Sequence, residues 1–270
     1  MCIRDRQKIL RYPNDSYDVG SYYKGEHLND IWGLTTIGIA KSQEEMDAHL
    51  AKVDQSSVGT NWGVGDIMYA DLDGDGKISN GTNKLGDTGD YRIIGNSTPR
   101  FKYGITLDAA WKGFDFSIFM QGIGKRDLWL DGCYFWGANG QGNEWQSTGF
   151  AEHWDFFRPE GDPLGANLNS YYPRVNFSGD RNTKVQTRYL QNGAYLRLKN
   201  VQLGYTLPRV WTEKAGISSV RVYVSGDNLA TITSLSKIFD PEATGSLAGT
   251  GSGKLYPLQR VISVGVNVNF

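Results

Sequence analysis

The sequence YPLQRVISVGVNVNF (residues 256–270) decides the fold, because it alternates with a period of two residues up to the C-terminal phenylalanine. Ile262, Val264, Val266, Val268 and Phe270 share one face of an extended strand, while serine, glycine and asparagine occupy the other. A solvated strand of a soluble sheet can alternate in this way. The terminal aromatic residue and the length, close to that of a tilted membrane-spanning strand, favour a membrane β-barrel.

The composition is typical of an all-β protein. Aromatic residues make up 13% of the chain and glycines number 34, while the mean hydropathy is -0.44. Many rings and turns with little continuous apolar sequence fit an outer-membrane barrel. The composition does not exclude a soluble β protein. No apolar run approaches the roughly 20 residues of a membrane helix. Cys2 and Cys133 do not indicate a disulfide framework.

The charge balance excludes some partners. The chain has 28 basic and 29 acidic residues and a net charge of -1, so it has no long-range field that would attract nucleic acid. We therefore expect no nucleic-acid partner.

Other stretches repeat the alternating pattern. Residues 101–111 and 114–121 alternate on either side of a reversal at Lys112 and Gly113, which predicts an antiparallel hairpin. Residues 194–205 alternate with a change of phase near Asn200 that indicates a β-bulge. Residues 220–225 alternate up to a break at Gly-Asp-Asn (226–228). One short amphipathic helix begins at Ser42, with Glu45 completing a capping box, and ends before residue 56.

These patterns predict an all-β fold made of antiparallel strands of a transmembrane β-barrel, with long extracellular loops and one short helix. If Phe270 lies at the periplasmic end, residues 206–218 and the turn at 112–113 face the periplasm, and the long segments 122–192 and 230–254 face outward. Short turns and long loops then segregate, as barrels require.

We divide the chain into three parts. Residues 1–16 hold a strand end at 7–12, residues 17–99 form an extracellular loop region, and residues 100–270 hold the barrel strands with their long loops. The charged start MCIRDR (1–6) joins no periodic element. We therefore expect the chain to begin inside a longer protein, with its leader upstream.

The densest local motif is GDIMYADLDGDGKI (residues 65–78). Its aspartates occupy the first, third and fifth positions of a calcium loop, followed by the turn glycine. A lysine in the next position offers its backbone carbonyl, and the ninth residue suits a contact through water. The candidate calcium ligands are Asp71, Asp73, Asp75, Lys77 and Ser79.

This motif departs from an EF-hand at its end. Thr82 replaces the bidentate glutamate, and the sequence beyond does not form an exit helix. Asp87 or Asp90 could close the site from a longer loop. The motif is compatible with two interpretations, a structural calcium ion and an Asp-Gly turn without metal.

Aromatic residues concentrate in the long segment 122–192. They can stack on a sugar or peptide ligand, or they can pack the segment onto itself. The candidate ligand-binding residues are Trp129, Tyr134, Trp136, Trp145 and Trp154.

The same segment has carboxylates near a histidine. Glu152, Asp155 and Glu160 flank His153, and paired carboxylates can hydrolyse glycosides. No second motif supports catalysis, and solvated loop charges explain these residues equally well. We expect no enzyme.

Several segments in order carry a family resemblance. They are IWGLTTIGIAKSQEEMDAH (31–49), GDIMYADLDGDGKI (65–78), IIGNSTPRFKYGITLDAAWKGFDFSIFMQGIGKRDLW (93–129), YLRLKNVQLGYTLP (195–208), RVYVSGDNLATIT (221–233), FDPE (239–242) and the terminal strand. Together they resemble the C-terminal part of SusC/RagA-type TonB-linked outer-membrane transporters, the TonB-dependent receptors. The resemblance spans nearly the whole chain from about residue 17.

The resemblance implies a fold and a function. The family forms a barrel of about 22 strands with an N-terminal plug, of which this chain would supply the last strands. It implies import of oligosaccharides, or in some members peptides, across the outer membrane of Gram-negative cells of the Bacteroidetes type. The implied partners are a SusD-like surface lipoprotein that closes as a lid, the TonB complex acting through the upstream part, and outer-membrane lipid. The alternative is a secreted, calcium-stabilised β-sandwich adhesin that binds glycans, which would not depend on detergent.

Overall fold

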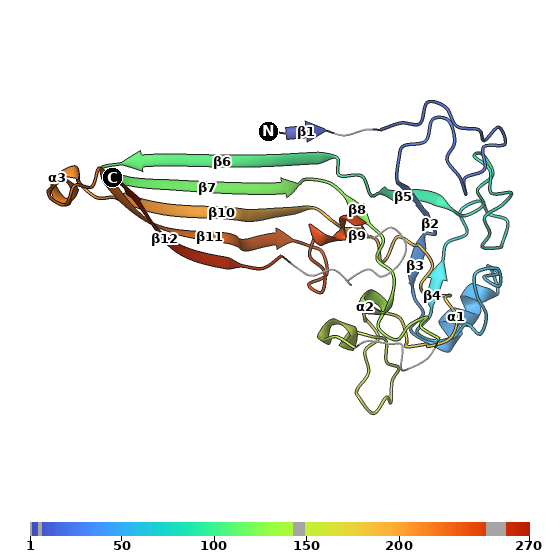
Figure 1. The fold of residues 1–270 in the computed structure, drawn as a ribbon. Helices are drawn as coiled ribbons and strands as arrows, with labels where there is room; N and C mark the ends of the chain where they lie inside the picture. The colour runs from blue at the N-terminus through green and yellow to red at the C-terminus, as the bar shows by residue number, and fades with distance from the viewer. Residues whose placement is uncertain (1, 5–6, 143–148, 247–257) are drawn as a thin grey trace.

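The computed structural model describes residues 2–4, 7–142, 149–246 and 258–270. Long strands lie side by side in one sheet, and a body of loops, short strands and helix α1 (Gln43–Leu50) lies beyond one end of them (Figure 1). We call this part, the described residues of 7–100, 124–194 and 234–246, the loop body. Beyond the other end lies the four-residue helix α3 (Arg209–Thr212) (Figure 1). None of the helices in the described residues has the length and apolar character needed to cross a membrane.

The sheet has six strands in the order β1-β6-β7-β10-β11-β12, and every neighbouring pair is antiparallel. The strands are β1 (Cys2–Arg4), β6 (Phe101–Trp111), β7 (Phe114–Ile123), β10 (Tyr195–Thr206), β11 (Ser219–Thr233) and β12 (Val261–Asn269). The predicted antiparallel β-structure is confirmed. Among the described strands β1 and β12 each have one neighbour, so closure into a barrel and its strand number stay predictions.

The apolar residues of the strands share one face of the sheet. Register places Ile118 of β7 between Leu107 of β6 and Val201 of β10, and it pairs Val224 with Val264. Directly paired residues point to the same side. This apolar face is open, since Leu107 is 54% exposed and Val264 is 73% exposed. Its exposed members are Ile105, Leu107, Trp111, Phe116, Leu203, Val222, Val224, Ile232, Ile262, Val264, Val266 and Val268.

Aromatic rings gather where the apolar face meets the short turn between β6 and β7. The ring centroids of Phe114 and Tyr205 lie 4.5 Å apart, and the Lys112 amino group lies 5.0 Å from the centre of the Trp111 ring. Lys112 and Gly113 both take positive φ, 46° and 89°, as a two-residue hairpin turn with primed geometry requires. An aromatic cluster of this kind, with a cation beside it, is typical of a membrane–water interface.

The opposite face of the sheet is polar. Arg221 of β11 forms an ion pair with Asp115 of β7 across the intervening strand β10. Gly204 of β10 lies beneath this pair, and a Cβ atom there would collide with both side chains. Other polar side chains of this face are Thr106, Ser117, Gln202, Ser225, Ser263 and Asn267.

Two irregularities bear on the sequence predictions. The predicted bulge in β10 is confirmed, because the register shifts between Leu198 and Asn200 against both neighbouring strands. The predicted break at 226–228 is wrong, since β11 continues to Thr233. Asn228 takes a left-handed φ of 52° and donates a hydrogen bond from Nδ2 to the Gln259 carbonyl oxygen at 3.1 Å. The chain therefore bulges within the strand instead of reversing.

The loop body is held by short two-stranded sheets. Its strands pair as β2 with β5, β3 with β4 and β8 with β9. Their bounds are β2 (Asp30–Gly33), β5 (Arg92–Asn96), β3 (Thr36–Ile39), β4 (Ile67–Tyr69), β8 (Asp127–Leu128) and β9 (Gln191–Asn192). Residues 7–12, where the sequence predicted a strand end, contribute only the isolated bridge of Lys8 with His27 among the described residues.

Helix α1 begins as predicted. Ser42 caps it, because its hydroxyl oxygen accepts the Glu45 N–H at 3.2 Å, and Met46 is buried. The Glu45 carboxylate accepts the N–H of Lys41 at 2.6 Å instead of that of Ser42, so the capping box is shifted by one residue. The other short helices within the described residues are α2 (Cys133–Trp136), η2 (Ala151–Trp154), η3 (Glu213–Ala215) and η4 (Ala243–Ser246).

The hydrophobic core lies in the loop body and not under the sheet. Leu34, Ile67, Tyr69, Phe135 and Tyr189 are fully buried there. A β-sandwich buries the apolar faces of its strands between two sheets. In the described residues the apolar face of the sheet is exposed instead, so the structure does not support the secreted sandwich alternative.

Candidate functional site

Aromatic side chains form a packed cluster in the loop body. Trp136 of α2 is 3% exposed, and its ring lies 4.7 Å from that of Tyr189 and 5.2 Å from that of Phe135, centre to centre. Trp129 is half-buried, with its ring 5.9 Å from Trp136. Contacts between rings at these distances stabilise the cluster beyond the burial of area.

The remaining predicted residues differ in exposure. Tyr134 is half-buried and stacks on Phe150 at 5.7 Å, whereas Trp154 is 59% exposed. Trp145 lies outside the described residues. The structure thus brings Trp129 and Trp136 into contact and leaves the Trp154 ring open to a ligand.

The buried tyrosines of the cluster stay neutral near pH 7. Burial raises the pKa of Tyr172 and of Tyr189 far above its ordinary value, because the phenolate would lose its hydration. The Tyr189 hydroxyl donates to the Tyr171 carbonyl oxygen at 2.9 Å. These rings therefore serve as walls and not as acids or bases near neutral pH.

A pocket of about 220 Å³ opens beside this cluster. We call it the aromatic pocket, and the rings that line it belong to Trp136, Phe150, His153, Trp154, Phe156 and Tyr172. His153 is fixed at both nitrogens, since Nδ1 accepts the Phe150 N–H and Nε2 lies 3.1 Å from the Phe135 carbonyl oxygen. The Nε2 atom therefore carries the hydrogen. Flat faces with few polar groups suit a ring or an apolar side chain of a ligand.

The acidic loop brings together a different set from the one predicted. Carboxylate oxygens of Asp71, Asp73 and Asp90 lie within 4.8 Å of one another. Asp90 is fully buried and accepts the N–H groups of Leu72 at 2.6 Å and of Ser79 at 2.8 Å. The chain therefore folds Asp90 back onto the start of the loop.

The other predicted ligands have local roles in the loop. The Asp75 carboxylate accepts the Lys77 N–H at 2.8 Å, and the Ser79 hydroxyl oxygen accepts the Gly81 N–H at 3.1 Å. Asp87 accepts the Thr82 N–H at 3.2 Å. Of the two candidates for closing the site, the described structure places Asp90 in the carboxylate group.

The carboxylates of this acidic loop differ in proton affinity. Hydrogen bonds from the N–H groups of Gly76 and Gly74 lower the pKa of Asp71. The Asp75 N–H acts to lower the pKa of Asp73, but desolvation and the neighbouring carboxylates outweigh it, so that this pKa is raised. Three convergent carboxylates are hard ligands that fit Ca²⁺, and such an ion would relieve their repulsion.

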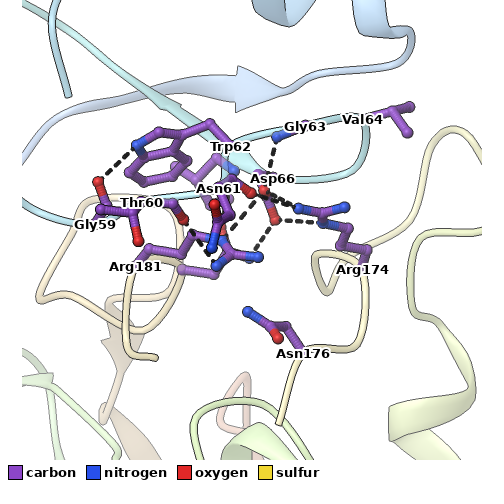
Figure 2. A network of polar contacts seen from close by, with 12 residues as sticks. Gly59, Thr60, Asn61, Trp62, Gly63, Val64, Asp66, Arg174, Asn176 and Arg181 are labelled. Atoms are coloured by element: carbon purple, nitrogen blue, oxygen red, sulfur yellow. Dashed lines mark hydrogen bonds and ion pairs between the residues drawn. The ribbon is translucent and has the colours of Figure 1, made fainter. Parts of the chain in front are cut away.

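A buried aspartate ties the loop body together (Figure 2). Asp66 has a fully buried carboxylate that Arg174 contacts at both oxygens, with Nε at 2.8 Å from Oδ1 and Nη2 at 2.6 Å from Oδ2. Arg181 and Asn182 add contacts at 3.2 and 2.8 Å, and the Gly63 N–H donates at 3.0 Å. No local pattern in the sequence indicates this network, because Asp66 and its side-chain partners lie more than 100 residues apart along the chain.

The Asp66 network also supports the aromatic pocket. Arg174 precedes Val175, a lining residue of that pocket, and its N–H donates to the Gly65 carbonyl oxygen at 2.8 Å. Gly65 has a φ of 84° and packs against the Phe157 ring, where no Cβ atom would fit. Gly65 and Asp66 thus hold Arg174 and Phe157, the chain neighbours of the lining residues Val175 and Phe156.

A second ion network joins the loop body to the sheet. Arg197 of β10 is 4% exposed and contacts Asp240 at 2.7 Å and Glu242 at 3.1 Å. Burial acts to raise the pKa of Asp240, but hydrogen bonds from Arg197 and from the backbone of Glu242 and Leu258 outweigh it and lower this pKa. The FDPE segment (239–242) is therefore fastened to the wall of the sheet.

Comparison with known proteins identifies relatives. No family model matches the chain. It is 33% identical over 216 residues to TonB-dependent receptor P3 of Formosa agariphila, covering 76% of the chain and 19% of the relative. It is 30% identical over 256 residues to TonB-dependent receptor P26 of the same organism, covering 91% of the chain and 23% of the relative.

Solved structures share the fold. The RagAB peptide importer in its open-open state matches with a TM-score of 0.60 at 21% identity, over 96% of this chain and 24% of that chain. Its closed-closed state matches with a TM-score of 0.59 at 24% identity. The relatives named are receptors and importers, not enzymes. The chain spans 19% and 23% of the length of the curated relatives named. From these similarities the chain belongs with the TonB-dependent receptors, and it shares the fold of the matching part of the RagAB importer.

Proposed function

We propose that the chain forms part of an outer-membrane importer that takes up glycans or other oligomeric nutrients with energy delivered through TonB. The exposed apolar face of the six-stranded sheet carries this proposal. A soluble protein rarely exposes a contiguous apolar surface of this kind, whereas a barrel wall requires one against lipid. The polar opposite face, with its Arg221–Asp115 pair, would then face the lumen.

The arrangement of connections supports a direction in the membrane. The turn at 112–113, the segment with α3 and the end of β12 lie at one end of the sheet, as the pairs Trp111–Phe114 and Ser219–Asn269 require. The loop body lies at the other end (Figure 1). In barrels of this class short turns face the periplasm and long loops face outward. The loop body would therefore face the cell exterior, in an outer membrane of the Bacteroidetes type.

The loop body is the part that would meet the ligand and the partner. The aromatic pocket could hold a sugar ring or an apolar peptide side chain against Trp136 and Trp154. The solved relatives are described as a peptide importer, so both ligand classes are worth testing. A SusD-like lipoprotein would cover this outer surface, and the TonB complex would act through an upstream part of the receptor.

Uptake by intact cells tests this proposal. Deletion of the gene should abolish uptake of a labelled oligosaccharide or oligopeptide, and plasmid-borne wild type should restore it. Dissipating the inner-membrane proton gradient should stop uptake while leaving surface binding, because TonB coupling needs that gradient. Unchanged uptake of both ligand classes in the deletion strain, or release of the protein from cells without detergent, would contradict the proposal.

We further propose that Asp71, Asp73 and Asp90 hold a structural calcium ion. Their carboxylates converge, and burial of Asp90 limits how far the group can spread. The ion would supply positive charge between like charges and fasten the acidic loop.

A further inference from the structure

A second pocket, of about 440 Å³, lies in the loop body where five segments meet. We call it the amide pocket. Its lining includes Trp32 of β2, Tyr91 just before β5, Ser57, Ser79, Asn80 and Asn83. It shares no lining residue with the aromatic pocket. None of these residues was a candidate from sequence except Ser79, which was considered for calcium.

The chemistry of this lining matches a sugar residue. A pyranose ring has apolar C–H faces and a rim of hydroxyl groups that both donate and accept hydrogen bonds. Two aromatic side chains can cover a face, while two amides and two hydroxyls can serve the rim. The volume lies within the range of about 300–1,000 Å³ for small-molecule sites. We propose that the amide pocket binds one sugar residue of a glycan.

Trp32 is present for its ring and not for its N–H group. Its indole Nε1 is buried and has no hydrogen-bond partner among the described residues. An unused buried donor costs stability, so the internal structure alone would favour a ring without one. A tryptophan offers the largest flat surface of any side chain, which is what stacking on a sugar face needs.

The polar side of the pocket is fixed before any ligand arrives. Asn83 has a left-handed φ of 58°, its Nδ2 donates to Asp18 at 2.8 Å, and its carbonyl oxygen accepts the Val19 N–H at 2.9 Å. The Ser79 N–H donates to Asp90 at 2.8 Å. Rigid walls reduce the ordering that binding would otherwise require.

This pocket goes beyond the proposed transport function, and its test needs no transport. The protein, purified from membranes in detergent, is titrated with maltotriose, mannotriose and xylotriose, with trialanine as a non-sugar probe, by saturation-transfer NMR and calorimetry. We expect one of the trisaccharides to bind and trialanine not to displace it. Trp32→Ala and Asn80→Ala should each weaken binding about tenfold, and Trp32→Phe should weaken it less.

Trp211→Ala is the matched control, because Trp211 of α3 is 67% exposed beyond the other end of the sheet and lines neither pocket. It should leave trisaccharide affinity unchanged. Asn80 is exposed, and its substitution keeps the backbone carbonyl that accepts the Asn83 N–H, so this variant stays informative if Trp32→Ala does not fold. The proposal is overturned if no trisaccharide binds, if trialanine displaces the bound sugar, or if Asn80→Ala weakens binding no more than Trp211→Ala does. It is also overturned if Trp154→Ala, in the aromatic pocket, weakens binding while Asn80→Ala does not. None of these results would test cellular uptake, so the uptake experiment would still decide the proposed transport function separately.

Discussion

The carboxylate of Asp66 organises the loop body from a single position. Its side-chain partners lie 108 to 116 residues later in the sequence, so it joins the long connection between β7 and β10 to residues 59–66. A fully buried carboxylate persists only where paired charges and hydrogen bonds replace its hydration. Arg174, Arg181 and Asn182 provide both.

Asp66→Asn should therefore destabilise the loop body strongly. The amide keeps the shape but removes the negative charge, which leaves Arg174 and Arg181 facing each other without a counterion. We expect a loss of about 3–5 kcal/mol in the free energy of unfolding, followed by tryptophan fluorescence in urea. Asp180→Asn is the control, since that side chain is 68% exposed in a surface pair with Lys184 and should cost less than about 1 kcal/mol. Equal losses in the two variants would show that the Asp66 network does not hold the loop body.

Few of the individual residues that form the sites could be predicted from the sequence. Asp66 stands inside GDIMYADLDGDGKI, where the aspartates draw attention to a cation, and nothing local points to arginines so far away. Asp87 and Asp90 were equivalent by spacing, and only the fold places Asp90 beside Asp71. Trp32 and Tyr91 gave no signal, because the segments that bring them together are not periodic.

Strands could be predicted from the sequence where one face meets an apolar environment and the other face a polar one. β6, β7, β10 and β12 alternate over 9 to 12 residues, which is long enough for a period to emerge. β2 and β5 span only four and five residues and pair across a long interval, so neither period nor turn chemistry could reveal them. The Gly-Asp-Asn sequence in β11 was read as a break because a left-handed asparagine serves turns and bulges alike.

The acidic loop is the element whose stability should respond to metal. Calcium at about 100 times its dissociation constant should stabilise the folded protein by about 2.7 kcal/mol, seen as a higher melting temperature that chelator reverses. Asp73→Asn should remove most of this effect, whereas Asp87→Asn, outside the carboxylate group, should retain it. Because the pKa of Asp73 is raised, protons compete for the site, and the effect of calcium should shrink from about pH 7 to about pH 4. A melting profile that chelator leaves unchanged would exclude the ion.

At the scale of the molecule, the loop body and the six-stranded sheet place their apolar residues in opposite ways. The loop body packs leucine, tyrosine and phenylalanine inside, as a protein in water does. The sheet turns its valines, leucines and rings outward and keeps an arginine–aspartate pair on the other face. Water cannot stabilise the second arrangement, but lipid against one face and an aqueous lumen against the other can.

Neighbouring positions in the middle of β6 test this division directly. Leu107 belongs to the apolar face and Thr106 to the polar face, at the same depth along the strand and both exposed. Leu107→Arg should destabilise the protein folded in phospholipid bilayers by about 2–4 kcal/mol, because the guanidinium would replace a leucine against hydrocarbon. Thr106→Arg should cost little, because its side chain would stay in the hydrated lumen. Urea midpoints and the fraction that inserts into the outer membrane measure both variants. Equal tolerance of arginine at the two positions would show that the apolar face does not contact lipid. It would thereby contradict the proposal that this sheet forms part of a barrel wall.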